Sequence, residues 1–132
     1  MTADLGRAAA HCPRCLAEYR AGFDTCADDG TSLLPGPAPV TEEHAPEDAR
    51  RHAAAQDDTP VVLCRLPQVD ADLMVAKLRS EGLGAFADQK LRGLWFSDIV
   101  PDFALCRVWV LESDLARAGE VARRALAGED AI

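Results

Sequence analysis

Hydrophobic positions in the second half of the chain follow the two periods that distinguish strands from helices. Residues 61–66 (VVLCRL) and 106–111 (CRVWVL) are apolar runs rich in β-branched side chains, and residues 84–88 (GAFAD) form a shorter one. Such runs favour strands because branched side chains pack well on a pleated surface. The pattern therefore predicts three strands within residues 61–132.

Two segments between and after these strands have the helical period. The first begins at Asp70, a suitable N-cap, and ends at Gly82, where a left-handed residue can close a helix. Its apolar positions recur every three or four residues: Ala71, Met74, Val75 and Leu78. The second helix follows Ser113, and its apolar face consists of Leu115, Ala118, Gly119, Ala122 and Leu126. The order β-α-β-β-α predicts an α+β sandwich with both helices on one face of the sheet.

The first half of the chain lacks this regularity. Residues 35–60 contain PGPAP, several acids and few large apolar side chains, which is typical of a flexible linker. Within them, residues 46–56 (PEDARRHAAAQ) have the features of a short helix, and we expect His44 and His52 to be solvated. The predicted organisation is an N-terminal module in residues 1–34, with a loose tail in 1–10, then the linker in 35–60 and an α+β domain in 61–132.

Three of the five cysteines lie in the N-terminal module, at a spacing typical of metal sites. Cys12 and Cys15 form a C-x2-C turn, which can direct two sulfur atoms at one metal ion, and Pro13 fixes one backbone torsion of that turn. After ten further residues, Cys26 begins a C-x2-D sequence that ends at Asp29. Zinc accepts carboxylate oxygen as well as thiolate and takes four tetrahedral ligands in structural sites. Cys12, Cys15, Cys26 and Asp29 are therefore the predicted ligands of one structural Zn²⁺ ion.

The spacing leaves alternatives open. His11, Asp28 or a water molecule can supply the fourth ligand instead of Asp29. The cysteines can also be free thiols, or Cys12 and Cys15 can form a disulfide, although a redox C-x2-C normally opens a helix and the following residues do not resemble one. Iron is another candidate metal, but an oxygen ligand is unusual for an iron–sulfur cluster.

This stretch resembles the small zinc-ribbon modules of many bacterial proteins. The matching positions are Cys12, Pro13, Cys15, Tyr19, Cys26, Asp29, Gly30 and Leu33. Full ribbons have a cysteine where this chain has Asp29. The resemblance implies a module of about two dozen residues that folds around its metal.

Residues 61–132 resemble a bacterial family described as prokaryotic signal-transducing proteins, whose biochemical function is unknown. The matching positions are Leu78, Gly82, Ala85, Val108, Val110, Asp114, Ala118 and Ala122. The resemblance implies a ferredoxin-like fold, distantly similar to that of nitrogen-regulatory PII proteins. In such a fold the strand in 106–111 is central and the strand in 61–66 lies at an edge, where we expect cover from the N-terminal half or pairing with a second copy to form a homodimer.

Charge and composition restrict the partners of the chain. The 132 residues carry 14 Lys and Arg against 22 Asp and Glu, a formal charge of −8. This balance argues against nucleic acid, because phosphate contacts need a basic surface. We see neither a secretory signal nor an apolar run long enough to cross a membrane, so we expect a cytoplasmic protein with reduced thiols and no membrane association.

The remaining candidate residues favour binding over catalysis. The chain has no nucleophile elbow, Walker loop or glycine-rich phosphate loop, so we expect it not to be an enzyme. Cys64 and Cys106 fall on neighbouring predicted strands, and we expect buried small side chains there rather than a redox pair or a second metal site. In the apolar connection 89–103, the candidates for a partner-binding patch are Leu94, Trp95 and Phe96. The alternative is that these three side chains complete the core.

The predicted function is a non-enzymatic zinc-binding adaptor or signal-transduction protein. The ribbon would provide structure or docking, and the α+β domain would bind a protein partner or a small ligand. The alternative is a nucleic-acid-associated regulator that uses the zinc ribbon. Salt-dependent binding to DNA or RNA separates the two.

Overall fold

The computed structural model describes residues 8–26, 29–88 and 104–127, and its centre is an antiparallel sheet. β6 (Ala104–Leu111) pairs with β4 (Pro60–Leu66) on one side and with β5 (Ala85–Ala87) on the other. β6 is therefore the central strand, and β4 stands at one end of the strand order, as the sequence predicts. Pairing of β4 with a second copy of the chain stays a prediction.

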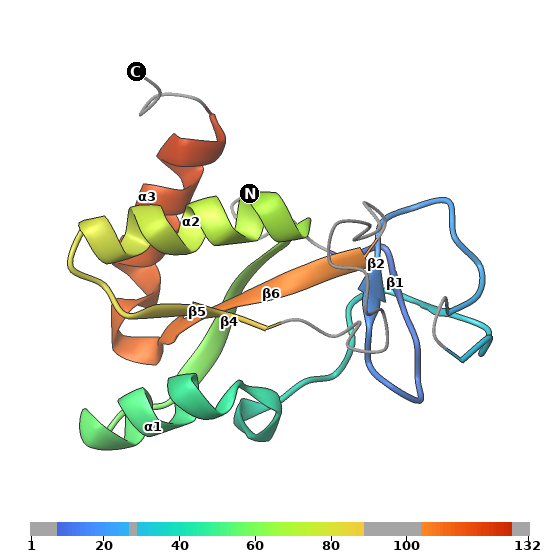
Figure 1. The fold of residues 1–132 in the computed structure, drawn as a ribbon, viewed down its shortest axis with the longest axis horizontal. Helices are drawn as coiled ribbons and strands as arrows, with labels where there is room; N and C mark the ends of the chain where they lie inside the picture. Colours follow the sequence, from blue (N-terminus) through green and yellow to red (C-terminus); the bar gives the residue numbers. More distant parts are fainter. Residues whose placement is uncertain (1–7, 27–28, 89–103, 128–132) are drawn as a thin grey trace.

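Two helices, α2 (Gln68–Ser80) and α3 (Leu115–Leu126), cover one face of this sheet (Figure 1). Both contribute to the main hydrophobic core, as the helical periods predict. Leu115 and Leu126 are exceptions, because both are exposed while Val121 is buried in their place. The core includes Cys64, Leu66, Ala71, Met74, Leu78, Val108, Val110, Ala118, Val121 and Ala122. Helices together with an antiparallel sheet confirm the α+β class.

The helices begin differently from the prediction. α2 has Pro67 at its N-cap, so Asp70 lies in its first turn. A 3-10 turn, η3 (Glu112–Asp114), precedes α3, and Ser113 lies inside this turn rather than at the cap of the helix. The end of α2 is as predicted, because Gly82 has a φ of +85°, a conformation that glycine adopts without steric cost.

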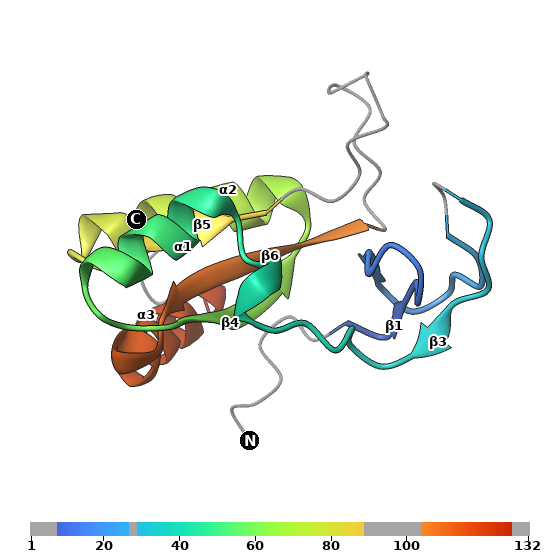
Figure 2. The same ribbon diagram turned by 90° about the horizontal axis from the view of Figure 1, so that it is seen from below.

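The opposite face of the sheet is covered by α1 (Glu47–Ala55), the short helix predicted after Pro46 (Figures 1 and 2). Ala45 and Ala49 are buried against the side chain of Trp109 on β6. Three partly buried side chains complete this second cluster: Val40, Val62 and Phe86. The sheet therefore lies between α1 on one face and α2 with α3 on the other.

Residues 35–60 thus differ from the flexible linker that their composition predicts. They contain the 3-10 turn η1 (Glu42–His44), whose N-cap Thr41 donates its backbone N–H to the His44 ring at 2.9 Å, and the packed helix α1. Low hydrophobicity is misleading here because α1 contacts the sheet through alanines. Such small side chains bury little area themselves, yet they let the helix approach a large indole ring.

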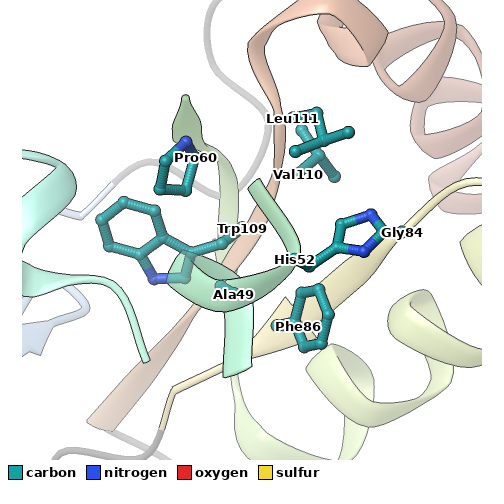
Figure 3. Close-up of a pocket in the computed structure, with 8 residues that line it drawn as sticks. All are labelled: Ala49, His52, Pro60, Gly84, Phe86, Trp109, Val110 and Leu111. Carbon is teal, nitrogen blue, oxygen red and sulfur yellow. The ribbon is translucent and has the colours of Figure 1, made fainter. Parts of the chain in front are cut away.

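His52 on α1 packs against the sheet instead of being solvated. Its ring lies over Phe86 with centroids 5.6 Å apart, and a Cβ atom added to Gly84 would be only 2.4 Å from its Nε2 atom. Figure 3 shows these side chains around a pocket between α1 and the sheet, which has no room for a water molecule. A side chain at position 84 would therefore displace the His52 ring from its present place, and the pocket is a packing feature.

The N-terminal module is an extension of the same sheet. Its strands are β1 (Ala10–His11), β2 (Glu18–Tyr19) and β3 (Leu34–Pro35), with β1 in the middle, and β2 pairs with the beginning of β6. The loose tail predicted for residues 1–10 is wrong for residues 8–10. Ala8 is buried, and the backbone N–H of Ala9 donates to the carbonyl of Tyr19 at 3.0 Å.

Candidate metal centre

Four side chains from the N-terminal module converge on one point. The Sγ atoms of Cys12, Cys15 and Cys26 and a carboxylate oxygen of Asp29 all lie within 4.8 Å of one another. Cys15 Sγ is 3.7 Å from Cys26 Sγ, and Cys12 Sγ is 3.6 Å from Asp29 Oδ2. In a tetrahedral zinc site with ordinary bond lengths, two sulfur ligands are about 3.8 Å apart and a sulfur and an oxygen about 3.5 Å apart. These two pairs therefore have the spacing of a tetrahedral site, and the other pairs lie within 4.8 Å.

The ligands come in two pairs, each on a turn that we call a knuckle. In the first knuckle the N–H of Cys12 donates to Ala17 O at 2.9 Å, and that of Leu16 donates to Cys12 O at 2.8 Å. The second repeats these bonds at the same offsets: Cys26 N to Thr31 O at 2.8 Å, and Gly30 N to Cys26 O at 2.9 Å. The two turns are thus equivalent, and Asp29 occupies the position that corresponds to Cys15.

Each knuckle closes with a residue in the left-handed conformation, directly after its second ligand. Gly30 has a φ of +74° and Leu16 a φ of +65°. Glycine adopts this conformation freely, whereas for leucine it costs about 1–2 kcal/mol. The surrounding contacts of the first knuckle must therefore hold Leu16 in place, and one of them comes from outside the module. The Arg107 side chain of β6 donates a hydrogen bond from Nη2 to the Leu16 carbonyl.

The local electrostatics differ among the cysteines. Burial raises the pKa of Cys12, but the backbone N–H groups of Cys15 and Arg14, at 3.5 and 3.4 Å from its sulfur, outweigh burial and leave this pKa below the ordinary value. Burial and the adjacent Cys12 and Cys26 sulfur atoms raise the pKa of Cys15 to about 12. Metal ions bind thiolates, so loading the site displaces thiol protons and its affinity falls as the pH is lowered.

Asp29 is the most accessible member of the cluster. Its carboxylate is exposed, and the side chain and backbone N–H of Thr31 lower its pKa to about 2. The N–H of Thr31 is 2.9 Å from Asp29 Oδ1. Asp29 is therefore ionised and held in place at neutral pH, as a metal ligand must be.

Replacing Asp29 should weaken the site without destroying it. Asp29→Ala leaves three sulfur ligands and room for water at the fourth position, so we expect at least about a tenfold loss of zinc affinity with one equivalent still bound at saturation. Asp29→Cys restores the four-sulfur set and should bind at least as tightly as the natural chain. Competition with a chromogenic chelator measures both. Equal affinity of Asp29→Ala and the natural chain would show that Asp29 is not a ligand.

His11, one of the alternatives to Asp29 as the fourth ligand, is engaged elsewhere. His11 Nδ1 lies at hydrogen-bond distance from the carbonyl of Gly36, 2.9 Å away, and is not among the clustered atoms. Asp28 lies outside the described residues. A small apolar core surrounds the cysteines, and the hydroxyl of Tyr19 donates to Cys26 Sγ at 3.4 Å. Phe23 and Leu34, in contrast, are exposed and contribute little to this core.

A buried cluster of charged side chains beneath the metal centre was missed by the sequence reasoning. Glu18 on β2 is paired with Arg107 on β6, with Nε and Oε1 2.7 Å apart, and with Arg65 on β4, with Nε and Oε2 2.7 Å apart. Arg107 also faces Asp88, whose carboxylate accepts from the indole N–H of Trp109 at 3.0 Å. The sequence did contain a signal for this cluster, namely one arginine inside each of two apolar strands, Arg65 and Arg107. Charged side chains are rarely buried without a partner, so each of these arginines indicates an acidic partner elsewhere in the chain.

The remaining sequence candidates do not form a second site in the described part of the chain. Cys64 and Cys106 are buried in the main core, and burial raises the pKa of each thiol to about 12. Thiols with so high a pKa are poor nucleophiles. This agrees with the prediction that both cysteines are buried small side chains and not a redox pair. The predicted partner-binding patch lies outside the described residues: Leu94, Trp95 and Phe96.

Comparison with known proteins gives no match from which a function could be assigned. The chain matches no protein-family model, no curated protein and no solved structure. Within the described ranges, none of the helices combines the length and the apolar character that a membrane crossing requires. What the chain does must therefore be inferred from the cluster of three cysteines and one aspartate.

Proposed function

We propose that this chain is a non-enzymatic zinc-binding protein that acts as an adaptor or in signal transduction. The observation that carries the proposal is the convergence of Cys12, Cys15, Cys26 and Asp29, within 4.8 Å of one another, on two equivalent knuckles. Such a closed set of four protein ligands is typical of structural zinc, whereas catalytic zinc keeps one position open for water or substrate.

The donor atoms favour zinc over other metals. Three thiolates exclude the hard cations Mg²⁺ and Ca²⁺, which take oxygen ligands. The carboxylate disfavours iron–sulfur clusters, which are held by sulfur and sometimes by histidine. A module with a core as small as Cys12, Ala17, Tyr19 and Cys26 also needs the metal for its stability, because it buries too little apolar surface.

The adaptor role follows from how the rest of the chain is arranged. We interpret the N-terminal module as a zinc ribbon and residues 61–132 as a ferredoxin-like domain, whose described part contains the three strands β4, β5 and β6. β4 stands at the end of the strand order, which supports pairing with a protein partner or with a second copy of the chain. The acidic balance of the chain, −8, supports a protein partner over nucleic acid.

Metal analysis of the purified chain tests the proposal. Protein purified under reducing conditions without added metal should contain one equivalent of zinc per chain, because four preformed ligands bind zinc tightly. Elemental analysis by plasma mass spectrometry measures zinc, iron, copper and nickel together. Less than about half an equivalent of any transition metal would contradict the proposal. One equivalent of iron would identify iron, and not zinc, as the bound metal.

A further inference from the structure

Arg107 connects the metal centre to the rest of the molecule. Its side chain is fully buried and comes from β6, yet it donates to the carbonyl of Leu16, directly after the second cysteine of the first knuckle. It also pairs with Glu18 on β2 and with Asp88 next to β5. A planar guanidinium can serve three acceptors at once because its five N–H donors point in fixed directions.

The charges around Arg107 are mutually dependent. Arg65 and Arg107 are directly opposite each other on β4 and β6, an arrangement that is repulsive unless an anion separates them. Glu18 supplies that anion, and its Oε2 also accepts the backbone N–H of Ala38 at 2.9 Å. Because β2 carries Glu18 and follows the first knuckle directly, loss of the ribbon structure would remove the anion. The buried Arg107 and the partly buried Arg65 would then face each other on the sheet.

From Arg107 the contacts continue to the face that α1 covers. The backbone N–H of Arg107 donates to Asp88 Oδ1 at 3.0 Å, and the indole N–H of Trp109 donates to Asp88 Oδ2 at 3.0 Å. Positions 107 and 109 are two apart on β6 and so face the same side of the sheet. Ala45 and Ala49 pack on the Trp109 side chain. An unbroken series of contacts therefore runs from the first knuckle to α1.

We propose that metal binding in the ribbon and the docking of α1 on the sheet are coupled through Arg107, so that the metal state controls the α1 face. The inference rests on the proposed zinc binding. With zinc bound, the knuckle holds the Leu16 carbonyl and β2 holds Glu18, so that Arg107 has a carbonyl acceptor and two carboxylates around it. Without zinc, Arg107 keeps only Asp88, and a buried cation with too few partners rearranges toward water. That movement disturbs Asp88, Trp109 and the alanines of α1.

Coupling of this kind is reciprocal. If zinc stabilises the Arg107 contacts, then intact Arg107 contacts must strengthen zinc binding by the same factor. Two experiments on the 132-residue chain, one in each direction, measure this coupling.

The first experiment compares zinc affinities of two conservative variants. Arg107→Lys keeps the charge but cannot serve the Leu16 carbonyl, Glu18 and Asp88 together, and we expect about a 10–100-fold loss of zinc affinity. Arg65→Lys is the matched control, since Arg65 pairs with the same Glu18 carboxylate, whereas the hydrogen bond to the Leu16 carbonyl comes from Arg107. It should stay within about threefold of the natural chain, since a lysine can keep this single ion pair. Equal losses in both variants would overturn the proposal.

The second experiment removes zinc from the natural chain with a chelator, so it does not depend on the folding of a variant. Hydrogen exchange should accelerate at least about tenfold in residues 8–36 and also in residues 47–55 and 108–111. In a Trp95→Phe background, Trp109 is the only remaining tryptophan, and its emission should shift to longer wavelength. Asp88→Asn should reduce the shift, because it breaks the series of contacts between Arg107 and Trp109.

The outcomes separate this inference from the proposed function. Absence of bound metal in the purified protein ends both. One equivalent of zinc, with exchange accelerated only in residues 8–36 and unchanged Trp109 emission on chelation, leaves the zinc site standing and overturns the coupling alone.

Discussion

Replacing Cys26 with alanine is expected to abolish tight zinc binding and to unfold the N-terminal module. The change removes one of three sulfur ligands and the acceptor of the Tyr19 hydroxyl. Binding of structural zinc to small modules releases about 10–16 kcal/mol at neutral pH, and this free energy is what folds them. Elemental analysis should find well under one equivalent of zinc, and hydrogen exchange should lose protection throughout residues 8–26 and 29–36.

Cys64→Ala is the matched control for this variant. It also removes one buried cysteine, but from β4 in the main core, away from the cluster. The control should keep one equivalent of zinc and lose only about 1 kcal/mol of stability, the effect of a small cavity. Full zinc content in Cys26→Ala, or loss of zinc in Cys64→Ala, would show that the metal is held elsewhere.

The second large effect is expected at Trp109. Its side chain is 1% exposed, packs against Ala45 and Ala49, and donates its indole N–H to Asp88. Trp109→Ala should lower the free energy of unfolding by about 3–5 kcal/mol, because it leaves a large cavity between α1 and the sheet. Urea denaturation followed by circular dichroism measures this loss.

Trp109→Phe separates packing from hydrogen bonding at the same position. Phenylalanine keeps most of the apolar volume but removes the N–H donor to Asp88, so we expect a smaller loss of about 1–3 kcal/mol. A loss below about 1 kcal/mol in Trp109→Ala would mean that α1 is not packed on the sheet in solution. In that case residues 35–60 would be the flexible linker that their composition predicts.

The structure places the proposed ribbon in the same sheet as the α+β domain. β2 pairs with β6 through Glu18 and Tyr19, and the buried charges of Glu18 and Arg107 lie at this junction. Buried ion pairs are costly to break from one side, because the remaining charge stays in the low-dielectric interior. This is why the two parts, although separate in the pattern of the sequence, are expected to respond to metal together.

Features that depend on nearby residues could be predicted from the sequence alone. The period of apolar positions identified the buried face of α2, namely Ala71, Met74 and Leu78, because a helix brings those positions together whatever surrounds it. The spacing C-x2-C and C-x2-D identified the four clustered side chains for the same reason. Each pair lies within one turn of backbone, and that turn sets the distance between the two ligands.

Features that depend on distant partners were decided only by the tertiary structure. α1 looks like part of a linker because its alanines become a buried face only beside Trp109, more than fifty residues away. Arg107 is only a charged residue inside an apolar strand until β2 brings Glu18 to it and the end of β5 brings Asp88. The free energy of burying a charged side chain depends on which opposite charge lies beside it. The pairing of strands that are distant in the sequence determines that neighbour.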